Sequence, residues 1–392
     1  MKIGFLFGSG ISLKAGYRRV SDITDIILSG EGISRHSTSE YYFLPPPYSH
    51  MGINKCEDVK RITNFLKLLF NENCTFNEEF KYNSVTNYED LYFLVRQIHD
   101  EIYGEQENLI VRKYIQNLEI DSASMLESKI QGFYHNFTFD DLINETITYI
   151  NNVVSRLLYK PRSDTSYLSI LAEILAKNNI DIFSLNHDLL LENYFEQNDI
   201  PFCDGFEEPK GDFKHFNLDK FYDKNNVNLL KLHGSSNWYR FRPKNTDWRG
   251  EFIGKCINND INHAKDENGE FINYLWNKSI ILTGTFNKLI DYNSGIFSDL
   301  FCLFPQKLAQ IKTLIISGYG FGDVGINTKI IEWYYKNSQN KIILIHKNPD
   351  ELKEKSRGAI SGKWGNWIKE ERLIIIKKWF EEITFYELNK LL

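Results

Sequence analysis

The chain has 392 residues, 42% of them hydrophobic, so it can bury a core large enough for two or three domains or for one domain with insertions. Its net charge of −6 and the lack of a long lysine or arginine run argue against direct binding to nucleic acid. The five cysteines are scattered, which fits a reducing compartment better than a disulfide framework. No stretch approaches the ~20 apolar residues of a membrane helix, and the apolar run before Gly8 is too short for a signal peptide. We therefore expect a soluble, cytoplasmic protein.

Short runs rich in isoleucine, leucine and valine recur along the chain, each bounded by polar residues or glycine. Continuous apolar runs of this length are typical of strands buried on both faces of a parallel sheet. We expect strands at residues 2–7, 181–185, 227–232, 279–282, 313–317 and 341–345, with an edge strand at 373–376. Helical patterns at 166–177 and 326–336 lie between them, and a closing helix is expected at 380–391. This alternation predicts an α/β fold with a doubly wound, mostly parallel Rossmann-like sheet.

A large helical insertion is expected to interrupt this alternation. Apolar residues recur at three- and four-residue spacing over 59–70, 91–103 and 142–158, which predicts helices. The segment Leu44-Pro45-Pro46-Pro47-Tyr48 predicts an extended, stiff connector at the start of the insertion. The polar stretch 240–278 is expected to form a long loop or a small lobe. The predicted division is a Rossmann domain at 1–45 and 165–392, with the helical insertion at 46–164.

Polar and glycine-rich segments follow nearly every predicted strand. They are Gly8-Ser9-Gly10-Ile11-Ser12, Asn186-His187-Asp188, His233-Gly234, the run from Gly318 to Asp323, and His346. Each alone has a simpler explanation, because glycine after a strand is often a turn residue and Asp188 is suited to capping the next helix. The first glycine loop also departs from GxGxxG, with Leu13 at the third glycine position. Ligands of an open α/β sheet nevertheless bind beyond the carboxyl ends of its strands, so we expect one ligand site at this edge.

In this order along the chain, the segments resemble the motifs of the sirtuin family. Gly8 to Ser12 is similar to the family's glycine–alanine–glycine–x–serine loop, and Leu185-Asn186-His187-Asp188 to its glutamine–asparagine–x–aspartate motif. His233 stands where the family has its catalytic histidine. The loop from Gly318 to Gly320 stands where the family has glycine–threonine–serine, and His346 where it usually has asparagine. The resemblance covers nearly the whole chain apart from the insertion and implies that the sheet binds NAD.

The resemblance also implies roles for individual residues. Asn186 would position the ribose and a water molecule, and His233 would act as a general base. Asp188 would accept hydrogen bonds from the carboxamide of nicotinamide. The remaining cofactor-binding residues would be Gly8, Ser9, Gly10, Ser12, Gly318, Tyr319 and Gly320 around the diphosphate, and His346 near the adenosine ribose.

The chain departs from sirtuin deacylases in ways that bear on function. Those enzymes carry a zinc module of four paired cysteines, whereas residues 240–278 offer only Cys256 and His263, so we expect no zinc or other metal. Zinc-free chains with a helical insertion resemble the branch used in bacterial antiphage defence, which consumes NAD without a protein substrate. The segment 87–91, Asn-Tyr-Glu-Asp-Leu, resembles a segment common in that branch, although we slightly favour an ordinary helix start as its explanation.

The resulting hypothesis is an NAD glycohydrolase that depletes NAD in antiphage defence. Two other classes stay open: a sirtuin-type deacylase or ADP-ribosyltransferase, and a non-catalytic sensor of NAD or ADP-ribose that gates a partner. A sensor would have little reason to keep both Asn186 and His233. Because 15% of the residues are aromatic, the insertion is a candidate interface of a homo-oligomer. The resemblance implies an ATPase of the HerA type or a short Argonaute as a possible partner.

Overall fold

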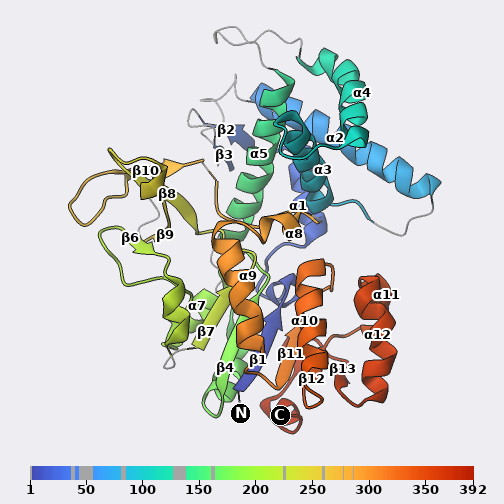
Figure 1. The fold of residues 1–392 in the computed structure, drawn as a ribbon, viewed down its shortest axis with the longest axis vertical. Helices are drawn as coiled ribbons and strands as arrows, with labels where there is room; N and C mark the ends of the chain where they lie inside the picture. Colours follow the sequence, from blue (N-terminus) through green and yellow to red (C-terminus); the bar gives the residue numbers. More distant parts are fainter. Residues whose placement is uncertain are drawn as a thin grey trace.

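A computed structural model describes residues 2–36, 40–43, 56–80, 85–126, 138–159, 164–223, 227–257, 261–276, 278–285 and 287–392. At its centre is a seven-stranded sheet in the order β13-β12-β11-β1-β4-β7-β5, and all of its strand pairs are parallel (Figure 1). The strands are β1 Lys2–Phe7, β4 Asn179–Ser184, β5 Phe202–Cys203, β7 Val227–Lys231, β11 Thr313–Ser317, β12 Lys341–Ile345 and β13 Leu373–Ile376. The predicted fold class, α/β with a parallel Rossmann-like sheet, is confirmed.

The sheet is buried on both faces, because successive side chains of each strand enter different parts of the core. In β1, Phe5 and Phe7 pack with α6 Ser169–Leu175 and the helices of the insertion, whereas Leu6 packs with the helices of the opposite face. Those opposite helices are α9 Gly295–Leu308, α10 Val324–Lys336, α11 Pro349–Lys355 and α12 Gly358–Lys369. The continuous apolar runs follow from this double burial.

One predicted strand is wrong. Residues 279–282 join no sheet, and their only ladder contact is an isolated bridge between Ile281 and Gly234. The backbone N–H of Ile280 donates to the carbonyl of Trp238 (2.8 Å), and the N–H of Leu282 donates to the backbone carbonyl of His233 (2.8 Å). The run is apolar because it is buried against the loop that follows β7. Its apolar character therefore reflects loop packing and not sheet formation.

Two predicted helices are shorter than expected. The pattern at 166–177 forms the 3₁₀ turn Ser166–Leu168 followed by α6. The pattern at 380–391 forms the 3₁₀ turn Phe380–Glu382 and the short α13 Phe385–Asn389. In contrast, the pattern at 326–336 lies entirely within α10.

The insertion is helical, and it packs directly on the sheet domain. Its helices are α2 Cys56–Glu79, α3 Tyr88–Ile102, α4 Leu109–Leu126 and α5 Phe139–Tyr159; α1 Val20–Ser29 and the hairpin of β2 Ile33–Arg35 and β3 Tyr41–Phe43 precede them. α2, α3 and α5 cover the three predicted patterns, whereas α4 was not predicted. One buried core runs from Phe5 of β1 to Leu91 of α3 and Val154 of α5. The proline-rich segment 44–48 lies outside the described residues, and the division into two domains stays a prediction.

The polar stretch 240–278 contributes to a small antiparallel lobe beside the main sheet (Figure 1). Its strands pair in the order β10-β8-β9-β6 and are β6 Phe213–His215, β8 Tyr239–Pro243, β9 Phe252–Cys256 and β10 Ile272–Leu275. Phe213 and Phe241 are fully buried at its centre. The structure therefore has a small lobe here, one of the two predicted forms. Within the described residues, no helix is both long and apolar enough to cross a membrane.

Candidate active site

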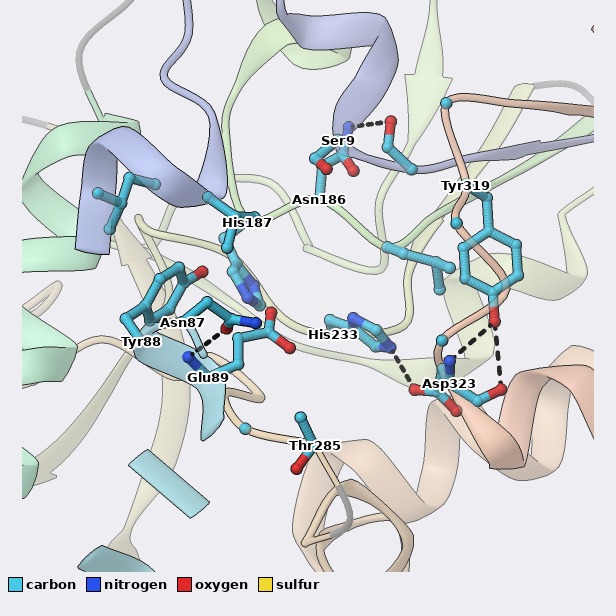
Figure 2. A pocket seen from close by; sticks show the side chains of 18 of the residues that line it. Ser9, Asn87, Tyr88, Glu89, Asn186, His187, His233, Thr285, Tyr319 and Asp323 are labelled. Carbon is cyan, nitrogen blue, oxygen red and sulfur yellow. Dashed lines mark hydrogen bonds and ion pairs between the residues drawn. The ribbon is translucent and has the colours of Figure 1, made fainter. Parts of the chain in front are cut away.

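A cavity of about 670 Å³ lies beyond the carboxyl ends of β1, β4, β7 and β11. It is within the ~300–1,000 Å³ that is typical of small-molecule sites. The strand order reverses at β1, which has β4 on one side and β11 on the other. An open α/β sheet binds its ligands at such a switch point. The insertion closes the opposite wall through the start of α3 (Figure 2).

Two glycine loops form one wall of the cavity and touch each other through their backbones. The N–H of Gly10 donates to the carbonyl of Gly318 (3.0 Å). A Cβ on Gly8 would lie 2.5 Å from that carbonyl oxygen, and one on Gly318 would lie 2.5 Å from the nitrogen of Ile11. Gly318 also has φ +67°, a conformation that residues with a Cβ rarely adopt. Only glycine fits at this contact, and the wall therefore presents backbone to the cavity.

Asn186 follows β4 and is held from behind. Its Nδ2 donates to the carbonyl of Gly8 (3.1 Å) and to the hydroxyl of Ser12 (3.1 Å). These two bonds use both amide hydrogens and fix which way the side chain points. Its Oδ1 is buried and has no hydrogen-bond partner. A buried acceptor without a donor costs about 1–3 kcal/mol, so this atom is suited to a donor that a ligand brings.

Asp188 has a structural role and also lines the cavity. Its Oδ1 accepts from the N–H of Leu190 (3.1 Å), the first residue of α7 Leu190–Gln197, although the N-cap position itself is Leu189. Burial raises the pKa of Asp188, and this effect exceeds the opposing effects of Lys231 and of the hydrogen bond with Ser12. Lys231 in turn forms a buried ion pair with Glu192 (2.8 Å).

His233 follows β7 and belongs to a buried group of three side chains. Its Nε2 lies 2.8 Å from the hydroxyl of Tyr292 and 3.1 Å from Oδ2 of Asp323, and the Tyr292 hydroxyl donates to the same Oδ2 (2.9 Å). Figure 2 shows the imidazole directed at the neighbouring carboxylate of Asp323. All three side chains are at least nine-tenths buried. The imidazole is therefore held in one orientation, which a general base requires.

The surroundings keep this histidine neutral. Burial is the largest effect and lowers the pKa of His233; Lys288 lowers it further, and Asp323 only partly offsets them. For Asp323, burial alone would raise the pKa, but the hydrogen bond from His233 and the charge of Lys288 hold it well below its usual value. Burial and Asp323 raise the pKa of Tyr292 well above its usual value, so the phenol keeps its proton. Near neutral pH the group is a carboxylate, a neutral imidazole and a phenol.

The start of α3 forms the wall that faces the sheet. Asn87 caps the helix, since its Oδ1 accepts from the N–H of Glu89 (2.8 Å), while the carboxylate of Asp90 accepts from the N–H of Asn87 (3.0 Å). Glu89 forms an ion pair with Lys288 of α8 Lys288–Asp291 (3.0 Å). The 87–91 segment is thus an ordinary helix start that also lines the site.

His187 lies between Asn186 and Asp188 and also lines the cavity. It is 6% exposed, and its Nδ1 is buried without a hydrogen-bond partner. Its ring centroid is 6.2 Å from that of His233. Burial lowers the pKa of His187 far below its usual value. This imidazole is neutral, and its Nδ1 is a second unsatisfied atom beside the site, after Oδ1 of Asn186.

The structure brings most of the predicted site residues to this cavity. The residues that line it are Gly8, Ser9, Ser12, Asn186, Asp188, His233, Gly318, Tyr319 and Gly320. Gly10 lies behind the wall against Gly318. His346 does not line the cavity: its Nδ1 accepts from the N–H of Asn348 (3.1 Å), and its ring contacts Trp379. The roles of all these residues stay predictions.

Several residues of the site were given no role from the sequence, among them the following four. Asp323 ends the glycine run after β11, a position that could have been recognised. Glu89 lies in the 87–91 segment, which was interpreted only as a resemblance. Lys288 and Tyr292 follow no strand, and only the tertiary fold brings Lys288 to the cavity and Tyr292 to His233. In the described part of the chain, no group of three or more histidine, cysteine, aspartate or glutamate side chains could hold a metal ion. The absence of zinc stays a prediction.

Comparison with protein families gives one match. Residues 181–373 fit the family described as a SIR2-like domain. This range runs from β4 to β13 and includes Asn186, His233 and Asp323, whereas the first glycine loop lies before it. A search of curated proteins finds no match to the chain. The domain match supports a sirtuin-like family and an NAD-related activity.

Proposed function

We propose that this chain, which carries a SIR2-like domain, is an NAD glycohydrolase that forms nicotinamide and ADP-ribose. The observation that supports it most is the meeting of two groups in one cavity. Asn186 presents an acceptor without a donor, and His233 is a buried, neutral and oriented base. A site that only bound NAD would not need an oriented base.

The cavity suits a dinucleotide. The contact between the loops at Gly8 and Gly318 presents backbone at one wall, and Gly320 and Gly322 face open space. Lys355 and Arg357 lie on the same rim, and Arg18 lines it as well. Backbone close to a phosphate and cations at the rim are the features that a diphosphate requires. Glu89 and Lys288 form the remaining wall.

The chemistry needs a positioned water molecule and one base. Nicotinamide leaves as a neutral molecule from a cationic pyridinium, so its departure requires no general acid. In the proposed reaction the bond between ribose C1′ and the pyridinium nitrogen breaks and a water oxygen bonds to C1′. His233 takes the proton of that water and releases it to solvent. NAD and water thereby give nicotinamide, ADP-ribose and one proton.

Two rival functions make different demands on the site. A deacylase or ADP-ribosyltransferase would release nicotinamide only when its acyl-lysine peptide or its acceptor was present. A sensor would bind NAD without releasing nicotinamide. We favour hydrolysis because a buried, oriented base lines a cavity large enough for a ligand and water.

The cellular role and the assembly are also proposals. The resemblance supports NAD depletion in antiphage defence, activated by self-assembly or by a partner such as an ATPase of the HerA type or a short Argonaute. Uncontrolled NAD hydrolysis would harm the cell that makes the enzyme. The isolated monomer is therefore expected to be weakly active. The aromatic-rich insertion is the proposed interface.

The test compares nicotinamide release by the parent with that by Asn186→Ala and His233→Ala, under conditions that activate the parent. Loss of a positioned base typically reduces rate by about 100- to 10,000-fold. We expect such a loss in each variant, and less than an additive loss in the double variant, because both groups act on one water and one ribose. Matched controls are Asn293→Ala and His99→Ala, neither of which lines the cavity.

Circular dichroism confirms that each variant is folded. Parent-like turnover by folded Asn186→Ala and His233→Ala would show that the active site lies elsewhere. Nicotinamide release that required a peptide would favour the transferase, and NAD binding without release would favour the sensor.

A further inference from the structure

Asp323 is fixed at both carboxylate oxygens. It caps α10, since its Oδ1 accepts from the N–H of Ile326 (2.9 Å). Its Oδ2 accepts from the hydroxyl of Tyr292 (2.9 Å) and lies 3.1 Å from Nε2 of His233. Capping determines which oxygen is left for the histidine. The carboxylate therefore cannot turn away without losing the helix cap.

Tyr319 holds the backbone behind this carboxylate. Its hydroxyl accepts from the N–H of Asp323 (3.3 Å) and donates to Oδ1 of Asn327 (2.9 Å). The phenol is buried, and burial raises its pKa well above the usual value. The side chain of Tyr319 thus supports Asp323 from within the fold, while the loop around it lines the cavity.

These contacts determine where the proton of His233 resides. A carboxylate oxygen only accepts hydrogen bonds, and the Tyr292 hydroxyl donates its single hydrogen to Asp323. Nε2 of His233 must therefore carry a hydrogen. In a neutral imidazole Nδ1 is then left with the lone pair.

We propose that Asp323, supported by Tyr292, is a positioning residue that fixes the Nε2–H tautomer of His233 and makes Nδ1 its basic atom. The inference rests on the proposed function only for what the base does, which is to take a proton from water. The tautomer itself is a property of the protein without NAD. It can be measured whether or not the chain hydrolyses NAD.

Several charged or titratable groups face His233 from the elements around it. They are Asp323 at the start of α10, Lys288 in α8, Tyr292 after α8, Glu89 in α3 and His187 after β4. Lys288 opposes protonation of the imidazole, and Asp323 and Glu89 favour it. Removing the charge of Asp323 must therefore make His233 harder to protonate.

The test uses Asp323→Asn. Asparagine caps helices as well as aspartate does, so its Oδ1 replaces the bond to Ile326 and its NH₂ group turns toward His233. That amide donates to Nε2, which moves the imidazole hydrogen to Nδ1 and blocks the base. We expect turnover of NAD to fall by about 100-fold or more. The acidic limb of the residual pH profile is expected to move to lower pH.

The matched control is Asp247→Asn. Asp247 also accepts from a backbone N–H at the start of a short helix, Trp248–Gly250, but lies in the small lobe outside the cavity. The Asp247→Asn variant should leave the turnover of NAD and its pH profile unchanged. A variant that only damaged folding would lower activity without moving the limb.

Nitrogen-15 NMR of histidine-labelled protein at pH 8, with His233→Ala for assignment, reads the tautomer directly. We expect Nε2–H in the parent and Nδ1–H in Asp323→Asn. Nδ1–H in the parent would overturn the inference even if Asp323→Asn fails to fold. Parent-like turnover and an unmoved pH limb in folded Asp323→Asn would also overturn it. If the parent protein has the Nε2–H tautomer but does not turn over NAD, the proposed function is wrong and the inference about the tautomer still holds.

Discussion

Gly318→Ala tests whether contact between the two glycine loops builds the site. The new Cβ would lie 2.5 Å from the nitrogen of Ile11 and 2.7 Å from the carbonyl oxygen of Gly8. Both neighbours are backbone atoms, so no side chain can rotate to relieve the overlap. The backbone at φ +67° adds about 1–2 kcal/mol for any residue with a Cβ. The substitution should therefore lower the free energy of unfolding by about 2 kcal/mol or more.

The loops must also separate, which moves Gly8 and the oxygen that holds Asn186. We expect kcat/KM for NAD to fall at least ~10-fold, since about 1.4 kcal/mol in transition-state binding is a factor of ten. The assays are denaturant unfolding and nicotinamide release. The matched control is Gly362→Ala in α12, where a Cβ meets nothing within 4 Å and should stabilise the helix by about 0.5–1 kcal/mol. Gly318→Ala with the stability and activity of the parent would refute the reasoning.

Three further predictions follow from the site. Burial lowers the pKa of His233, so kcat/KM for NAD should persist below the usual histidine pKa of about 6.5 and fall only as the pH drops through the lowered value. An acidic limb of the pH profile above 6.5 would contradict this. Lys288→Met removes a charge that opposes protonation of His233, so the acidic limb should move to higher pH, opposite to Asp323→Asn. Elemental analysis should find well under one zinc per chain. One zinc per chain would instead favour the deacylase hypothesis.

The sheet could be predicted because its strands are buried on both faces. The runs at 2–7, 313–317 and 341–345 coincide with β1, β11 and β12. The same rule failed at 279–282, where an apolar run packs against a loop and satisfies its backbone without a ladder. An apolar run therefore indicates that a segment is buried. Whether its backbone pairs with a strand or with a loop is determined by the tertiary structure.

The part of the candidate site that could be predicted is the part formed by residues at strand ends. Asn186 and His233 directly follow buried strands, so the topology alone brings them to one edge of the sheet. Lys288 reaches the cavity from the short α8, and Tyr292 reaches His233 from the residue after it; no sequence pattern marks either of them. His346 also ends a strand, yet β12 lies one strand farther from the switch point than β11, and the residue does not line the cavity.

The most direct test of NAD hydrolysis is the stoichiometry of products. Purified protein, under conditions that activate it, is incubated with NAD and no peptide, and nicotinamide and ADP-ribose are resolved by chromatography. We predict the two products in a 1:1 ratio, and neither from His233→Ala. Intact NAD in the presence of fully activated parent protein, or nicotinamide that appears only when an acyl-lysine peptide is added, would contradict the proposed function.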